Sequence, residues 1–158
     1  MGGIVEALIA NHADVTALTE TAGKITAITM ATSAKFHRYQ LPRNTGSLSS
    51  NWQVNAENGT KFVQTDLLLV FNRMETTKRV EMSALAVNDL RAIVKDANGV
   101  FWLLGEEEPV VANAADGQTG TAKTDANRYS ITLEDNNSTF PKEILMGSGG
   151  VDLDAIVG

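Results

Sequence analysis

A glycine-containing turn between two runs of strand-forming residues is the feature that most constrains the fold of this chain. Residues 90–96 (LRAIVKD) and 100–104 (VFWLL) flank the dipeptide Asn98-Gly99. Asparagine and glycine tolerate the positive φ angles that a two-residue type I′ turn requires at both central positions. The sequence therefore predicts a tight antiparallel hairpin and a fold rich in β-strands.

A second signal comes from strict alternation between residues 129 and 134. Tyr129, Ile131 and Leu133 alternate with Ser130, Thr132 and Glu134. Side chains of a strand point to opposite faces in turn, so the three apolar residues share one face. This pattern predicts a strand with one buried face and one face in water.

Other segments extend the β pattern. Runs rich in β-branched and aromatic residues predict strands at 24–30, 34–41, 48–54 and 61–71, and Asn58-Gly59 predicts a second hairpin between the last two. Shorter candidates are 4–10, 14–19, 108–112 and 143–146. The first two are short enough to be a strand, a loop or a helical turn, and 108–112 is expected at a sheet edge.

Residues 76–88 interrupt the β pattern. Good helix formers dominate there, Thr76 or Thr77 is suited to cap the start, and Val80, Ala84 and Val87 share one face. We expect one amphipathic helix that covers a side of a sheet. Residues 113–127 are small and polar and predict a mobile loop. The expected organisation is one β-rich domain over 1–146 and a flexible C-terminal tail over 147–158.

Composition excludes several classes of protein. The 158 residues contain no cysteine, so disulfides, thiolate metal sites and a thiol nucleophile are excluded. Thirteen basic and 19 acidic side chains give a net charge of −6, which opposes a tight grip on phosphate backbones. No signal peptide and no apolar run long enough to cross a bilayer is evident, so we expect a soluble, unsecreted protein.

Candidate chemical sites all have simpler interpretations. His12 and His37 lack metal-ligand spacing, and Glu106-Glu107-Glu108 is expected to be a solvated charge run. Asp116, Asp125 and Asp135 border expected loops but lack the pattern of an EF-hand. Residues 117–124 (GQTGTAKT) differ from a phosphate-binding loop because Ala122 precedes the lysine. We therefore expect no enzyme, no catalytic or metal-binding residues and no cofactor.

Two segments taken together resemble the major tail tube proteins of bacteriophages, in particular those of Bacteroidetes-type phages. They are residues 93–105 (IVKDANGVFWLLG) and 120–133 (GTAKTDANRYSITL), about a third of the chain together with their surroundings. The likeness lies in the Asn-Gly hairpin with its aromatic strand, followed by a Gly-Thr-Ala loop, an aspartate and a tyrosine-containing strand. Arg128 departs from the pattern, because a glycine is more usual there.

The resemblance implies a mainly β fold, a tail-tube-like β-sandwich or barrel with one flanking α-helix at about 76–88 and extended loops. It further implies a virion structural protein that is assembled in the host cytoplasm and located in the virion tail. Six copies would form a hexameric ring, and stacked rings would make a hollow tube for DNA ejection. The implied partners are other copies of the chain, other tail or neck proteins, and genomic DNA that passes without specific binding.

The charge and the edges of strands fit this expectation. Six copies at −6 each would carry −36, and like-charge repulsion would let DNA pass a lumen with little adhesion. Strands that begin around Lys24 and Lys61 are candidates for pairing between subunits. Contacts between rings are expected from the loops at 44–50 and 55–60 and from residues 149–158.

Alternative functions remain open at this point. A neck or connector ring or a tail terminator would form one closed ring instead of a polymer. A monomeric β-sandwich binding module could use aromatic residues to stack on a sugar, the candidates being Trp52, Trp102, Tyr39 and Tyr129. A hydrolase would need two carboxylates that converge in a cleft, one of them with a raised pKa.

Overall fold

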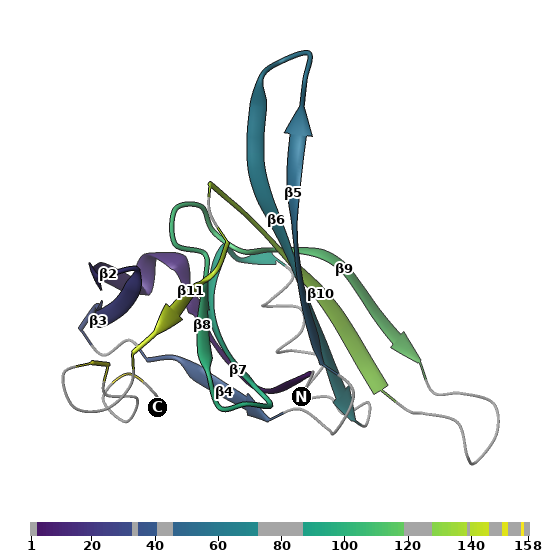
Figure 1. Cartoon of the computed structure of the whole chain (residues 1–158). Helices are drawn as coiled ribbons and strands as arrows, with labels where there is room; N and C mark the ends of the chain where they lie inside the picture. The colour runs from purple at the N-terminus through teal and green to yellow at the C-terminus, as the bar shows by residue number, and fades with distance from the viewer. Residues whose placement is uncertain are drawn as a thin grey trace.

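The chain folds into two β-sheets, as a computed structural model shows for residues 3–32, 35–40, 46–72, 87–118, 128–138, 140–145, 150–151 and 156 (Figure 1). In chain order the elements of this described part are β1 (Ile4–Asn11), the 3-10 helix η1 (His12–Asp14), β2 (Val15–Thr21), β3 (Lys24–Met30), β4 (His37–Gln40), β5 (Ser47–Asn55), β6 (Thr60–Asn72), β7 (Leu90–Asp96), β8 (Phe101–Leu104), β9 (Val111–Gln118), β10 (Arg128–Asn137) and β11 (Lys142–Ile144). The prediction of a mainly β fold is confirmed.

The strands divide unequally between the sheets. The seven-stranded sheet has the order β2-β3-β11-β8-β7-β1-β4, and the four-stranded sheet has the order β5-β6-β10-β9. Hairpins make most of the pairings antiparallel, whereas β11 lies parallel to β3. Residues 105–110 carry the chain from β8 in the first sheet to β9 in the second, and we call this segment the crossover.

Two apolar clusters hold the sheets together. The first lies between the sheets and combines Leu90, Ala92 and Val94 of β7 with residues of β6 and β10 such as Leu67 and Leu133. The second covers the opposite face of the seven-stranded sheet and includes residues of β1, β3, β8 and β11. Because both faces of β7 are covered, residues 90–94 are all buried. This explains why that strand reads as a nearly continuous apolar run.

The hairpin around Asn98-Gly99 is confirmed, but its predicted turn type is wrong. β7 and β8 pair antiparallel, with Lys95 opposite Phe101. Gly99 has φ +84°, whereas Asn98 does not have a positive φ, so the loop is not type I′. The carboxylate of Asp96 accepts hydrogen bonds from the amides of Asn98 and Val100 at 2.8 and 3.0 Å. This side chain favours a three-residue loop that ends in a left-handed glycine.

A two-residue loop with positive φ at both positions instead joins β2 to β3. Ala22 has φ +54° and Gly23 has φ +81°, and Thr21 pairs with Lys24 across the loop. Alanine is an unusual residue here because its Cβ disfavours the left-handed region. The sequence does not predict this turn, since Ala22 carries no turn signal.

Replacing Ala22 with asparagine is expected to stabilise the protein by about 1 kcal/mol, because asparagine tolerates the left-handed conformation and Ala22 is exposed. Urea denaturation would measure the change in the free energy of unfolding. The matched control is Ala27→Asn, at an exposed position inside β3 with ordinary strand geometry, where no gain is expected. An equal gain at both positions would contradict the explanation.

Several predicted segments have a different outcome. Residues 113–118 were expected in a loop but extend β9, because the backbone of β10 pairs with them without needing large side chains. Residues 119–127 lie outside the described part of the chain. So does most of the predicted helix, of which only Val87 and Asn88 are described; Val87 is highly exposed.

The C-terminal segment contacts the body of the protein at the positions that the structure describes. Val151 and Ile156 are buried in the second apolar cluster. The amide of Val151 donates to the carbonyl of Leu145, and the amide of Phe36 donates to the carbonyl of Ile156, both at 2.7 Å. At these two residues the expected flexible tail is part of the core.

Candidate functional site

The outer face of the four-stranded sheet is polar. Alternation along β6 and β10 buries Val63, Leu67, Ile131 and Leu133 and turns their neighbours away from the core. We call this outer surface the polar face; its described side chains are Ser47, Ser49, Asn51, Gln53, Thr60, Phe62, Gln64, Asp66, Leu68, Val70, Val111, Ser130, Thr132, Glu134 and Asn136, of which Val70 is buried. Two of these side chains are carboxylates and none is basic.

The two carboxylates of the polar face are neighbours. Asp66 of β6 lies directly opposite Glu134 of β10. Like charges at opposed positions of adjacent strands repel each other. Side-chain amides offset this repulsion, since Gln64 donates to Asp66 at 3.4 Å and Asn136 donates to Glu134 at 3.0 Å. The centre of the polar face is therefore a concentrated negative site.

Both outer strands of this sheet have a free side within the described residues. β5 pairs only with β6, and β9 pairs only with β10. A free strand edge presents backbone N–H and C=O groups that can pair with another chain. The four-stranded sheet can thus be extended at both sides, with the polar face between the two edges.

The β5–β6 hairpin projects beyond the rest of the molecule (Figure 1). Trp52 and Val54, on the side of β5 opposite to the polar face, are 57% and 61% exposed. Phe140 is 49% exposed, and its ring lies 5.8 Å from that of Trp52 between centroids. An exposed apolar cluster of this kind is typical of an interaction surface.

The other aromatic candidates have different surroundings. Trp102 is partly buried, and its Nε1 donates to Asp96 at 3.1 Å. The side chains of Tyr39 and Tyr129 lie outside the described part of the structure. Of the two predicted stacking residues whose side chains are described, Trp52 is the one that lies in solvent.

A cluster of charged and polar side chains surrounds the crossover. Arg91 is 5% exposed and donates from Nε to the carbonyl of Gly105 at 2.8 Å and from Nη2 to that of Glu106 at 3.2 Å. Its Nη2 also contacts Nε2 of His12 at 2.9 Å. A guanidinium has no acceptor, so His12 accepts this hydrogen bond in its neutral form. Burial, followed by the charge of Arg91, lowers the pKa of His12.

Asp135 lies on the other side of the crossover and is 3% exposed. Burial raises its pKa to about 6, and the charges of Glu106 and Glu107 add to the rise, although hydrogen bonds from Gly105 and Asn137 oppose it. Sequence reasoning considered Asp135 for a loop cation site, but the structure places it inside β10 with its side chain toward the core.

The remaining predicted residues do not converge on one site. Glu107 and Glu108 are exposed, in line with a solvated charge run, whereas Glu106 is partly buried and accepts from Lys142 at 2.7 Å. His37 is exposed in β4. The side chain of Asp116 and the whole of Asp125 lie outside the described residues. Within the described residues, no group of three or more histidine or acidic side chains is arranged to hold a metal ion.

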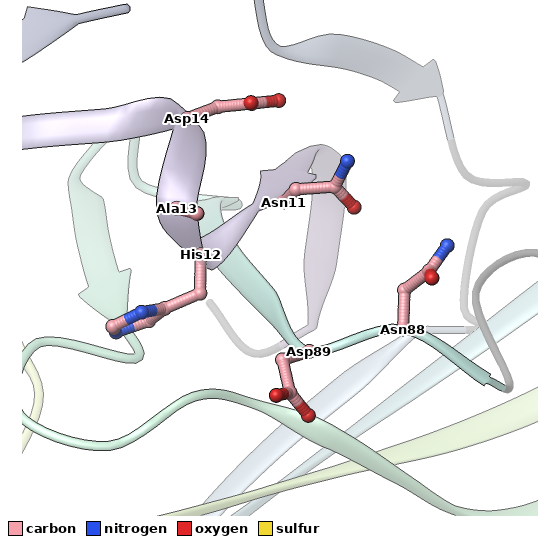
Figure 2. A pocket seen from close by; sticks show the side chains of 6 residues that line it. All are labelled: Asn11, His12, Ala13, Asp14, Asn88 and Asp89. Carbon is pink, nitrogen blue, oxygen red and sulfur yellow. The ribbon is translucent and has the colours of Figure 1, made fainter.

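Two small pockets open near η1. The first, of about 340 Å³, is lined by Asn11, His12, Ala13, Asp14, Asn88 and Asp89. Figure 2 shows that the carboxylates of Asp14 and Asp89 lie well apart and that the ring of His12 points away from both. The second, of about 350 Å³, is lined by β2 together with Arg91, Glu106 and Glu107. Asp135, the carboxyl with the raised pKa, lines neither of these two pockets.

The loops predicted to contact a neighbouring ring are placed as follows. Residues 47–50 belong to β5 instead of a loop, and Gly46 bridges to Ile4. Residues 56–59 form the tip of the projecting hairpin between β5 and β6. No helix in the described part of the chain has the length and apolar character needed to cross a membrane.

Comparison with known proteins gives no relative to set beside this geometry. Neither a protein-family model, nor a curated protein, nor a solved structure matches the chain.

Proposed function

We propose that the chain is a virion structural protein, a tail tube subunit that forms hexameric rings stacking into a hollow, DNA-conducting tube. The observation that carries the proposal is the polar face, which bears carboxylates and no described basic side chain, between two free strand edges. The polar face supports the proposal independently of the sequence resemblance in residues 93–105 and 120–133. In this proposal the protein is not an enzyme and needs no cofactor.

The free edges supply a way to close a ring. If β9 of one subunit pairs with β5 of the next, the four-stranded sheets join into one continuous sheet. A contact between two different edges is head-to-tail, and such contacts make a ring when the rotation closes. The polar face then lines the lumen, where Asp66 and Glu134 repel the phosphates of DNA.

The projecting hairpin supplies a contact between rings. Trp52 and Val54 expose apolar area on the projecting β5–β6 hairpin, which the seven-stranded sheet does not cover (Figure 1). Burial of such area against the adjacent ring would stabilise the stack. Partners would then be further copies of the chain and other tail or neck proteins, in a virion tail assembled in the host cytoplasm.

Two observations favour other functions. Ring closure by strand edges serves a neck or connector ring or a tail terminator equally well, and in these cases stacking would not follow. The exposure of Trp52 beside Phe140 also suits a monomeric module that stacks on a sugar.

Negative-stain electron microscopy of the purified chain over a concentration series, with mass from light scattering, tests the proposal. Stacked rings or hollow tubes are the expected result. Single rings that never stack would favour a neck or terminator role. A monomer at every concentration, including after addition of preformed tail fragments as nuclei, would contradict ring formation.

Replacing Trp52 with serine is expected to stop stacking while rings still form, because it removes exposed apolar area from the hairpin and leaves the edge of β5 intact. The mean length of the tubes in micrographs should fall at least tenfold, because the variant should lose more than about 1.4 kcal/mol of stacking free energy per contact. Val5→Ser, which removes an exposed apolar residue from β1, is the matched control and should leave the tubes unchanged. Normal tubes in the Trp52 variant would exclude the hairpin as the stacking contact.

A further inference from the structure

One side-chain amide fastens the crossover to the four-stranded sheet. Asn137 of β10 is 7% exposed, and its Oδ1 accepts hydrogen bonds from the amides of Glu107 and Glu108, both at 3.0 Å. Its Nδ2 donates to Oδ1 of Asp135, two residues earlier on the same face of the strand. The contact with Asp135 therefore fixes the direction in which Asn137 presents its oxygen to the crossover.

Asp135 also contacts the start of the crossover directly, through a hydrogen bond with the backbone of Gly105. Gly105 has φ +84°, and a Cβ there would lie 3.1 Å from the carbonyl oxygen of Leu90. The crossover thus packs closely against both sheets where it leaves β8. Asp135 and Asn137 fasten it to β10, and just beyond the strand Ser138 donates to the carboxylate of Glu107 from its amide at 3.3 Å and from its hydroxyl at 2.6 Å.

The charged groups that face Asp135 do not neutralise it. Glu106 and Glu107 of the crossover add negative charge. Lys142 of β11 is engaged by Glu106 at 2.7 Å and by Glu20 at 2.5 Å. On β6 the opposed residue is Thr65, which is uncharged. Glu134, the neighbour of Asp135 in β10, points to the opposite face. Arg91 of β7 donates to the carbonyl groups of Gly105 and Glu106, and the ring of His12 hydrogen-bonds with Arg91 and with the backbone of Gly105.

We propose that Asp135 and Asn137 form a proton-controlled latch, which holds the crossover against β10 and closes as the solution becomes more acidic. When the latch opens, Asp135 meets water and its carboxyl returns to an ordinary affinity for protons. Ionisation then stabilises the open form more than the closed form, in which the charge is buried among other carboxylates. Protonation removes this difference and favours the closed form.

The size of the effect follows from linkage. The pKa of Asp135 is about 6 in the closed form, compared with the ordinary value of 3.8. Because the closed form binds the proton more tightly, the opening equilibrium should rise about tenfold between pH 5 and pH 7 and change little above pH 7. His12 acts in the opposite direction, because its lowered pKa means that acid weakens its contact with Arg91.

Hydrogen exchange of single amides, measured by NMR from pH 5 to pH 8 and corrected for intrinsic exchange rates, tests the latch. The amides of Gly105, Glu107 and Glu108 are expected to open about tenfold less often at pH 5 than at pH 7. In Asp135→Asn this dependence should disappear. Glu134→Gln, a neighbouring change on the polar face, should retain it. His12→Gln should also retain it, which separates the two titrations.

A second variant covers the case in which Asp135→Asn does not fold. Glu107→Gln removes one of the charges that oppose ionisation of Asp135, so the midpoint of the change should move to lower pH. Any of three results would overturn the proposal. The first is an unchanged midpoint in Glu107→Gln, and the second is an unchanged pH dependence in Asp135→Asn. The third is an equal pH dependence at core amides of β1 and β7, which would show global unfolding instead of a local latch.

Discussion

Replacing Gly105 with alanine is expected to lower the free energy of unfolding by about 3 kcal/mol. The backbone at Gly105 has φ +84°, where an L side chain costs about 1–2 kcal/mol. The added Cβ would also lie 3.1 Å from both the carbonyl oxygen of Leu90 and Cγ2 of Val110. Relief of these contacts requires a shift of packed backbone, with a further cost of about 1–3 kcal/mol.

Gly99 provides a closely matched control for this measurement. It has the same φ of +84°, but nothing lies within 4 Å of the Cβ that alanine would add. Gly99→Ala should therefore show the backbone cost alone, about 1 kcal/mol. Urea denaturation followed by tryptophan fluorescence gives both values. Equal losses in the two variants would mean that close packing at the crossover does not contribute.

If the polar face lines the lumen of a DNA-conducting tube, reversing its two described charges is expected to make the assembled protein retain DNA. The variant with Asp66→Lys and Glu134→Lys changes the net charge of each chain from −6 to −2 and places the new positive charges side by side. If this face lines a lumen, six pairs of lysines meet the phosphate backbone. At low salt, at least tenfold more DNA should cosediment with the assembled variant than with the unaltered protein. This retention should fall as salt is raised, because binding to phosphates releases counterions and so weakens with salt concentration.

The position of the charges is tested by an equal change elsewhere. Asp14→Lys together with Asp89→Lys alters the net charge by the same amount but lies beside η1, away from the polar face (Figure 2). This control should retain far less DNA than the polar-face variant. Equal retention by the two variants would show that net charge, and not a lumen lined by the polar face, controls adhesion.

Local patterns predicted most strands of this fold, because alternation and turn residues act over short distances. The strand at 24–30 and both Asn-Gly hairpins were predicted, and alternation between 130 and 134 matches the observed burial. The types of the turns were harder to predict from the sequence than their positions. Asp96 selects the loop at Asn98-Gly99 by accepting amide hydrogen bonds, and the type I′ geometry occurs at Ala22-Gly23, where sequence gives no signal.

The features that depend on distant segments were not predictable. Residues 113–118 contain two alanines and no large apolar residue, and they form a strand because β10 lies beside them. Arg91 is buried inside an apolar run because carbonyl groups of the crossover and of Val15 accept its hydrogen bonds. Asp135 and Asn137 are two residues apart in sequence, but their contact matters for the fold only because the crossover packs against them. The sequence signal for this contact is a pair of polar residues two positions apart, on the strand face whose other residues are apolar and point to the core.

The position of β11 has a consequence for the order in which the chain can fold. β11 is the last of the described strands in sequence, yet it lies between β3 and β8 in the seven-stranded sheet. A nascent chain that has not yet released residues 142–144 from the ribosome therefore cannot join β2 and β3 to the rest of this sheet. Contacts this distant in sequence make folding slow. Synthesis itself thus delays completion of this sheet, and the edges of β3 and β8 become unavailable to other chains only when β11 enters between them.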